Sequence, residues 1–217
     1  MIIGYKKLRK ATFLISLMLF LAFTNTYAQE TANEAFTKGE AYRASYKFDE
    51  AIAEFDKVIK LDPNSPSGYA SRALCYSGKG NYEKALADST KAIELDPKNA
   101  VAYTCRGMVY QEKNDNAQAM IDYTKAIELA PKQSVAYMQR GVLYAKRGDV
   151  DLALSDFNKV VEFDPNVPDA YVARAIIYWQ QKDYNKAWDN VHKAEALGYP
   201  VEQEFINDLK KDSGREK

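Results

Sequence analysis

Four arginines and three aspartates recur at fixed spacings along the chain, and their charges are the first candidates for chemistry. The arginines lie 34 residues apart, and an aspartate follows each of the first three by 16 residues. A row of arginines can bind a polyanion, but an arginine with a carboxylate in reach forms an internal ion pair. The spacing favours ion pairs of Arg72 with Asp88, Arg106 with Asp122 and Arg140 with Asp156. Arg174 meets Asn190 instead and is the best candidate for a free cation.

The two cysteines and the one histidine are the other reactive side chains to weigh. Cys75 and Cys105 fall in neighbouring periods of the sequence, so a disulfide between them is one reading. The sequence does not fix the Cα separation of roughly 4.4–6.8 Å that a disulfide needs, and two small buried thiols are the alternative. His192 has no cluster of metal-ligand residues around it, which predicts no metal site. Phosphate-binding loops and nucleophile motifs are missing from the sequence, so we expect no cofactor and no catalysis.

A period of 34 residues organises most of the chain. Columns of proline, tyrosine and alanine repeat in the same register, as is typical of proteins built from stacked structural units. The columns contain Pro63, Pro97, Pro131 and Pro165; Tyr69, Tyr103, Tyr137 and Tyr171; Tyr42, Tyr76, Tyr110, Tyr144 and Tyr178; and Ala51, Ala85, Ala119, Ala153 and Ala187.

Each period predicts an antiparallel pair of helices. Two amphipathic stretches of about 14 residues are joined by turn-forming residues, for example 100–113 and 116–129 around Asn114. Arg106 and Asp122 stand at equal distances from residue 114 and should therefore face each other across the pair. Small residues midway along the first helices should let the two helices approach closely, and they are Gly39, Ala73, Gly107, Gly141 and Ala175.

These columns resemble the signature of the tetratricopeptide repeat (TPR) family, through Tyr137-x-x-Arg140-Gly141-x-x-Tyr144, Ala153-x-x-x-Phe157 and Pro165. The resemblance implies an all-α, right-handed superhelical solenoid of about five repeats. The repeats are predicted at residues 32–65, 66–99, 100–133, 134–167 and 168–200. Phe205, Ile206 and Leu209 predict a capping helix at 201–211, and 212–217 is predicted to be a disordered tail.

The first helices of this family line a concave face, which implies a groove for a peptide or a partner's helix. Here the first-helix positions outside the packing columns are unusually apolar, whereas a solvated face would be charged. We call these positions the apolar strip, and they are Leu74, Val101, Thr104, Met108, Val135, Met138, Val142, Val172, Ile176 and Trp179. The alternative is that some of them pack between neighbouring first helices.

Family members that clamp a terminal carboxylate use Lys, Asn and Arg on these same faces. The corresponding positions of this chain hold Phe36, Glu40, Ser71, Val101 and Cys105. The residues therefore do not support that binding mode.

The first 28 residues predict a secretory signal peptide. Four basic residues precede a mainly apolar run, Ala11 to Phe23, and small residues lead to a cleavage site after Ala28. A membrane anchor is the alternative, but this run would cover only about 20 Å as a helix, against a hydrocarbon core of about 30 Å. Without these four basic residues the charge changes from balanced, at 30 basic and 30 acidic residues, to a net −4. We expect a periplasmic or secreted protein that binds no nucleic acid.

These expectations combine into a leading hypothesis of an exported scaffold that holds a peptide or helix of an envelope partner in the apolar groove. Self-association within an envelope complex is a second hypothesis, and a hydrolase is a remote third. No small-molecule substrate is expected, because the sequence offers no machinery for one.

Overall fold

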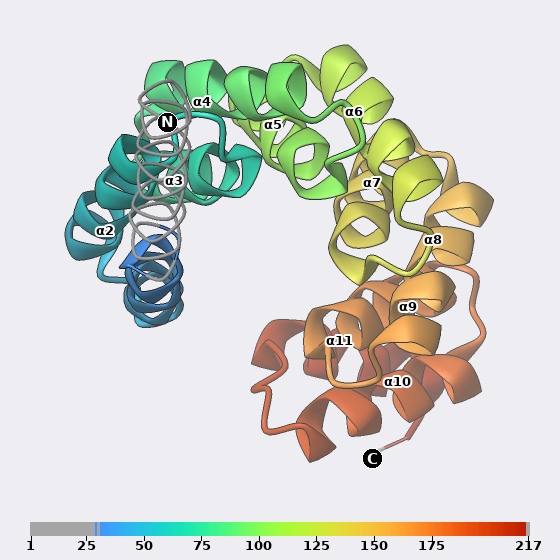
Figure 1. Ribbon diagram of the computed structural model, residues 1–217. Helices are drawn as coiled ribbons and strands as arrows, with labels where there is room; N and C mark the ends of the chain where they lie inside the picture. The colour runs from blue at the N-terminus through green and yellow to red at the C-terminus, as the bar shows by residue number, and fades with distance from the viewer. Residues whose placement is uncertain (1–28, 30, 216–217) are drawn as a thin grey trace, which may run out of the picture. The chain divides into compact units, whose positions relative to one another are not determined.

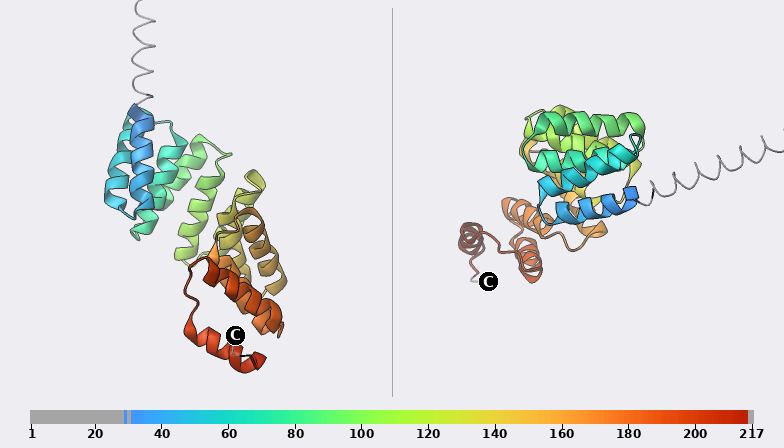
Figure 2. Two further views of the ribbon diagram at one scale, coloured as in Figure 1. Left: turned by 90° about the horizontal axis from the view of Figure 1, so that it is seen from below. Right: turned by 60° about the vertical axis from the view of Figure 1, so that its left-hand side comes forward.

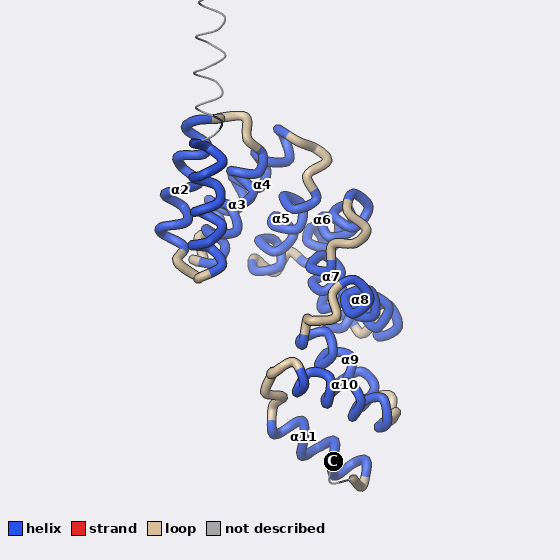
Figure 3. The backbone as a smooth tube through the Cα atoms, turned by 60° about the horizontal axis from the view of Figure 1, so that its bottom comes forward, coloured by secondary structure: helices blue, strands red, loops and turns tan. Residues whose placement is uncertain are grey.

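The computed structural model describes residue 29 and residues 31–215 (Figure 1). These residues form helices joined by short loops, and none of them lies in a strand (Figure 3). The predicted signal peptide falls outside the described residues. The chain divides into two compact units, Met1–Pro97 and Lys98–Lys217.

Consecutive helices in each unit pair as hairpins (Figure 1). In the first unit a helix over residues 31–44 is followed by α2 (Phe48–Leu61), α3 (Pro66–Gly78) and α4 (Tyr82–Leu95). The second unit contains α5 (Ala100–Glu112), α6 (Asn116–Leu129), α7 (Ser134–Arg147), α8 (Val150–Phe163), α9 (Pro168–Gln180), α10 (Tyr184–Ala196) and α11 (Gln203–Ser213). Helices α3, α5, α7 and α9 begin at the first residue of a predicted repeat.

The turn inside each hairpin reverses the chain through one residue in the left-handed region. This position repeats every 34 residues and is held by Tyr46, Gly80, Asn114, Gly148 and Lys182, with φ between 57° and 86°. The next residue donates its N–H back to a tyrosine carbonyl five positions earlier, as Asn81 does to Tyr76 over 2.8 Å. This is the hydrogen bond that closes a helix end when the chain turns sharply. Asn81 then caps the second helix by accepting the N–H of Lys84.

The second helix of each of the first four hairpins ends just before a proline. Asp62, Asp96 and Asp164 adopt extended backbone angles there, with φ near −140° and ψ near 90°. A following proline disfavours helical angles at its predecessor, which explains the common stop. The prolines therefore set where the second helices of these four hairpins end.

The cores form where the second helix of one hairpin meets the first helix of the next. In the first unit Phe55 of α2 packs with Cys75 of α3. In the second unit Tyr123 of α6 packs with Leu143 of α7, and Phe157 of α8 packs with Ile177 of α9. A single hairpin leaves these faces uncovered, so neighbouring hairpins within a unit stabilise one another.

Helix α11 covers the apolar face of the last hairpin (Figure 2). Its Ile206 and Leu209 pack against Trp188 and Val191 of α10. The expected disordered tail is wrong at its first two residues, because α11 continues through Asp212 and Ser213 and ends at Gly214 with φ 69°. Both residues accept tryptophan N–H groups, which explains the extra length.

Candidate functional site

An ion pair joins the two helices of each middle hairpin. Arg106 donates from Nε and Nη2 to the two carboxylate oxygens of Asp122, both over 2.8 Å. Arg72 with Asp88 and Arg140 with Asp156 repeat this bidentate geometry over 2.7–2.9 Å. The three aspartates are buried, so each pair is largely shielded from water. These arginines have an internal structural role and are not exposed as a binding strip.

Tyrosine rings flank the same guanidinium groups. The Cζ atom of Arg140 lies 5.8 Å from the ring centroid of Tyr137 and 5.6 Å from that of Tyr144. Arg72 and Arg106 lie between the equivalent tyrosines at similar distances. The hydrogen bonds that each of the three arginines donates to its aspartate raise the pKa of the guanidinium, against the opposing effect of burial. The tyrosine columns thus enclose the ion pairs.

The preceding hairpin adds a further contact to two of these arginines. Arg72 Nη1 donates to Asp56 of α2 over 2.5 Å, so Arg72 bridges two carboxylates. Arg140 Nη1 donates to the Thr124 hydroxyl of α6 over 3.3 Å at the same relative position. Each of these arginines therefore also links its hairpin to the one before it.

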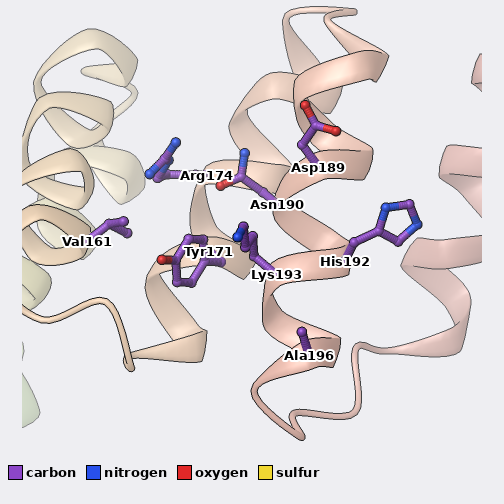
Figure 4. A pocket seen from close by; sticks show the side chains of 8 residues that line it. All are labelled: Val161, Tyr171, Arg174, Asp189, Asn190, His192, Lys193 and Ala196. Carbon is purple, nitrogen blue, oxygen red and sulfur yellow. The ribbon is translucent and has the colours of Figure 1, made fainter.

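Arg174 of α9 lacks these partners. Asn190 replaces the aspartate of the other hairpins, and Asn158 stands 16 residues before Arg174, where Arg72 has Asp56. The Arg174 Nε atom is buried and has no hydrogen-bond partner in the structure. The guanidinium borders a pocket of about 660 Å³ between α8, α9 and α10 (Figure 4). Asp189, Asn190 and Lys193 of α10 also line this pocket.

The apolar strip is only partly exposed. Val101, Val135 and Ile176 are the most exposed of its members, at 44%, 47% and 37%. Thr104 is buried at 4% exposure, and its hydroxyl donates to the carbonyl of Ala100, so its place in the strip was wrong. The other members are partly buried, namely Leu74, Met108, Met138, Val142, Val172 and Trp179. The packing alternative therefore applies to part of the strip.

Trp179 belongs to the contact with the cap. Its ring meets Phe205 of α11 edge to face, with the centroids 5.7 Å apart. Its Nε1–H donates to Asp212 over 2.9 Å. Helix α11 thus covers a residue that the sequence placed in the groove.

An apolar pocket opens where the strip passes from α7 to α9. It measures about 230 Å³, and Val142 and Ile176 of the strip line it together with Ala145, Ala173 and Ile177. Val150 and Phe157 of α8 also contribute to its lining. A pocket of this size and character suits one apolar side chain of a ligand.

The cysteines are both buried. Cys75 packs against Ala51 and Phe55 of the preceding hairpin, and burial raises the pKa of its thiol to about 11. Cys105 is 1% exposed and lies in the other unit. Both cysteines are free in the structure, as in the alternative of two small buried thiols.

His192 and the acidic side chains are the remaining candidates for a metal site. His192 is exposed and stacks on the ring of Trp188, with the ring centroids 5.6 Å apart. Within residues 29 and 31–215, no three His, Cys, Asp or Glu side chains come together in a way that could hold a metal ion. The described helices also include none with the length and apolar character needed to cross a membrane.

Comparison with family models identifies the repeats. Two models described as tetratricopeptide repeat match residues 66–99 and 134–167 and residues 90–120, and one described as TPR repeat matches residues 39–80. The chain belongs to the tetratricopeptide repeat family. The matched segments contain the ion pairs Arg72–Asp88 and Arg140–Asp156.

Solved structures show the same all-α TPR fold. MamA is 26% identical over 74% of this chain and 94% of its own, with a TM-score of 0.59. YrrB, described as a TPR protein with an unusual peptide-binding site, is 25% identical over 75% of this chain and 84% of its own, with a TM-score of 0.53. PilF of Pseudomonas aeruginosa is 19% identical over 85% of each chain, with a TM-score of 0.76, and shows the fold alone. Comparison with curated protein sequences gives no match.

Sequence reasoning missed two features of this TPR protein that its own columns contain. The second carboxylate of Arg72, Asp56, precedes it by the same 16 residues that separate it from Asp88. Lys193 belongs to a lysine column in which Lys91, Lys125 and Lys159 are each followed three residues later by a glutamate, whereas Ala196 stands at that place in the last repeat and Lys60 in the first. Comparing the charged residues that precede and follow each repeated arginine and lysine, repeat by repeat, would have found both features.

Proposed function

We propose that this TPR protein is an exported, non-catalytic scaffold that binds a peptide or helix of an envelope partner through the apolar pocket between α7 and α9. The observation that carries the proposal is the pocket of about 230 Å³, lined by Val142 and Ile176 of the apolar strip. Its lining is mainly apolar, and Ile176 is 37% exposed beside it. Exposed aliphatic groups around a pocket mark surfaces where another protein binds.

Two further features agree with a peptide as ligand. Val135 extends the exposed apolar surface along α7, so more than one side chain of the ligand would find contact. YrrB, which is 25% identical, is described as having a peptide-binding site, and this supports the class of ligand. A ligand with apolar residues at helical or extended spacing would fit best.

A pull-down with a matched pair of variants tests the proposal. Ala145→Glu with Ile176→Glu places two carboxylates at the pocket, and both positions are exposed enough for the helices to remain folded. Ile121→Glu is the control, because Ile121 is 59% exposed on α6 and does not line the pocket. Residues 29–217 of each variant, checked by circular dichroism, are incubated with the envelope fraction of the source organism.

Partners retained by the parent chain and by Ile121→Glu, but lost by the double variant, would support binding at the pocket. Binding of the purified partner to the same three proteins must then show the same difference. Equal capture by all three would overturn the pocket as the binding site.

Self-association is the second candidate, because Ile121 and Leu152 expose apolar surface on α6 and α8, away from this pocket. Sedimentation equilibrium of the parent chain distinguishes the two functions. A mass that rises with concentration and falls to that of a monomer in Ile121→Glu would favour self-association.

Export is the part of the proposal that rests on sequence alone. Protein recovered from a fractionated source organism should begin at Gln29, as N-terminal sequencing can establish. A chain that retains residues 1–28 in the cytoplasmic fraction would remove the envelope from the proposal.

A further inference from the structure

The last repeat lacks two carboxylates that the three preceding repeats have, one beside a lysine and one beside an arginine. In the second, third and fourth repeats Lys91, Lys125 and Lys159 pair with a glutamate three residues later, over 2.7–3.2 Å. In the last repeat Lys193 stands in this lysine column and Ala196 in the glutamate column. Asn190 likewise replaces the aspartate that pairs with the arginine in those repeats.

Both unpaired cations border one pocket. Arg174 of α9 and Lys193 of α10 line the pocket of about 660 Å³, a volume within the range of about 300–1,000 Å³ typical of ligand sites. In Figure 4 the Arg174 and Lys193 side chains lie on either side of the Asn190 and Tyr171 side chains. Asn190 and Ala196, which stand where the three preceding repeats have carboxylates, therefore both line this one pocket.

The charges around the pocket leave an excess of cations. Asp189 is the one carboxylate that lines it, and in Figure 4 this group points away from Lys193. His192 also borders the pocket, but its ring points away from Arg174 and stacks on Trp188. Arg174 and Lys193 thus outnumber the single acid, whereas the equivalent cations of the preceding repeats each have an acidic partner.

The buried Nε atom of Arg174 is the observation that points to a ligand. Buried N–H groups are almost always hydrogen-bonded, because an unpaired one costs folding free energy. The equivalent Nε of Arg72, Arg106 and Arg140 donates to an aspartate oxygen in every case. The donor at Arg174 is in place, and residues 29 and 31–215 provide no acceptor for it.

We propose that the Arg174–Lys193 pocket binds a carboxylate of a peptide ligand, which takes the place of the aspartate present in the other repeats. Arg174 would donate from Nε and a terminal nitrogen to the two carboxylate oxygens, as its counterparts do to aspartate. Lys193 would add a second positive charge beside it. The carboxylate comes either from an acidic side chain or from a chain end.

This site is separate from the apolar pocket of the proposed function. Arg174 lies two residues from both Val172 and Ile176, which places it about 200° around α9 from the apolar strip. Its ligand would therefore approach on the opposite face of α9. The proposal stands or falls independently of the apolar pocket.

Nuclear magnetic resonance of the arginine Nε–H groups tests the site directly. The chain of residues 29–217 is titrated with sodium acetate against sodium chloride at equal ionic strength. The Arg174 Nε–H signal is expected to shift and saturate with acetate only. The Arg140 signal is the internal control and should stay in place, because Asp156 already occupies that arginine.

Two variants show whether the missing carboxylates define the site. Asn190→Asp with Ala196→Glu restores the pattern of the other repeats, and the Arg174 signal should then shift without ligand and no longer respond to acetate. Arg174→Gln should weaken acetate binding about tenfold or more. The Arg174→Gln variant should still fold, because the Arg174 Nε–H has no acceptor in the structure and only the contact of the guanidinium with the Tyr171 ring is lost. Ile176→Glu should leave acetate binding unchanged.

Peptides distinguish the source of the carboxylate. One peptide carries a single internal glutamate and an amidated end, and its match has glutamine and a free C-terminal carboxylate. Saturating shifts of Arg174 with either peptide would support the proposal and identify the source. Shifts that chloride reproduces, a stronger response to inorganic phosphate than to acetate, or no response to both peptides would overturn it.

Discussion

The ring of Tyr123 fills the space that a side chain on Gly107 would occupy. A Cβ atom at Gly107 would stand 2.6 Å from Cε1 of Tyr123, closer than packed atoms approach. Gly39 with Phe55 and Gly141 with Phe157 repeat this relationship. In the two hairpins with alanine at the glycine position, the opposing residue is the smaller Ser89 or Val191. The glycines at these positions thus make room for an aromatic side chain, which matters more here than a close approach of the two helix backbones.

Gly107→Ala should therefore destabilise the protein, although alanine is the better helix former. Helix propensity favours alanine by roughly 1 kcal/mol, and overpacking costs about 1–3 kcal/mol. Overpacking should prevail, because Tyr123 is fully buried and its hydroxyl donates to Gln111 over 2.9 Å, which holds the ring in place. Urea unfolding measures the difference.

The same substitution in a Tyr123→Ser background provides the control. Serine faces alanine in the second repeat, so the penalty of Gly107→Ala should vanish there. An equal penalty in both backgrounds would mean that the ring is not its cause.

The second prediction exchanges the partners of two arginines. Asp156→Asn leaves Arg140 opposite a neutral amide, as Arg174 is now, and should lower the free energy of unfolding by about 1–3 kcal/mol. Asn190→Asp should raise it by roughly 1 kcal/mol, because Arg174 gains a charged acceptor. Denaturant unfolding of both variants checks the opposite signs, and a loss of stability in both would contradict the pairing argument.

The third prediction concerns the turn inside the last hairpin. Lys182 has φ 62°, a conformation that costs a residue with a Cβ atom roughly 1–2 kcal/mol. Lys182→Gly should therefore stabilise the protein by about 1 kcal/mol, measured by the thermal midpoint. Gly148→Ala, at the same place in the preceding hairpin with φ 86°, should destabilise it and serves as the opposite case.

The repeated residues of the sequence predicted the hairpins well, because the formation of a hairpin depends on interactions between residues close in sequence. The proline stops, the turn residues and the spacing of 16 between Arg106 and Asp122 all act within one hairpin. Thr104 and Trp179 were misplaced because each contacts a residue that is distant in sequence, and for Thr104 this residue is Gln133, which accepts from its hydroxyl. Trp179 is covered by α11, whose docking a helical pattern cannot show. The two pockets were likewise out of reach, since side chains of three helices line each of them.

The fourth prediction uses the thiol of Cys75. Burial raises its pKa from 9.0 to about 11, so the folded state holds the thiol proton more tightly than the unfolded state. The stability that this provides is fully present below about pH 9 and is lost as the pH rises through 11. Burial also raises the pKa of Tyr123, which adds a loss of the same sign at higher pH. The thermal midpoint should fall between pH 9 and 11, and less so in Cys75→Ala.

Alkylation of the same thiol distinguishes free thiols, which the structure has, from a disulfide. Native protein at pH 8 should react slowly with iodoacetamide at Cys75, because the thiol is buried and protonated. After unfolding without a reductant, a free thiol would be labelled at once, whereas a disulfide with Cys105 would block both residues. Mass spectrometry of the peptides separates these two results.

The fifth prediction is that α11 holds the last hairpin together. Leu209 is fully buried against α10, so Leu209→Ala should cost about 2–4 kcal/mol. The two tryptophans of the chain report this loss, because Trp179 donates to Asp212 and Trp188 donates to Ser213, both on α11. Tryptophan emission should shift to longer wavelength at lower urea concentration than in the parent. Lys211→Ala, an exposed change on the same helix, should leave the transition in place, and a similar shift in both variants would show that the side-chain packing of Leu209 is not what holds the cap.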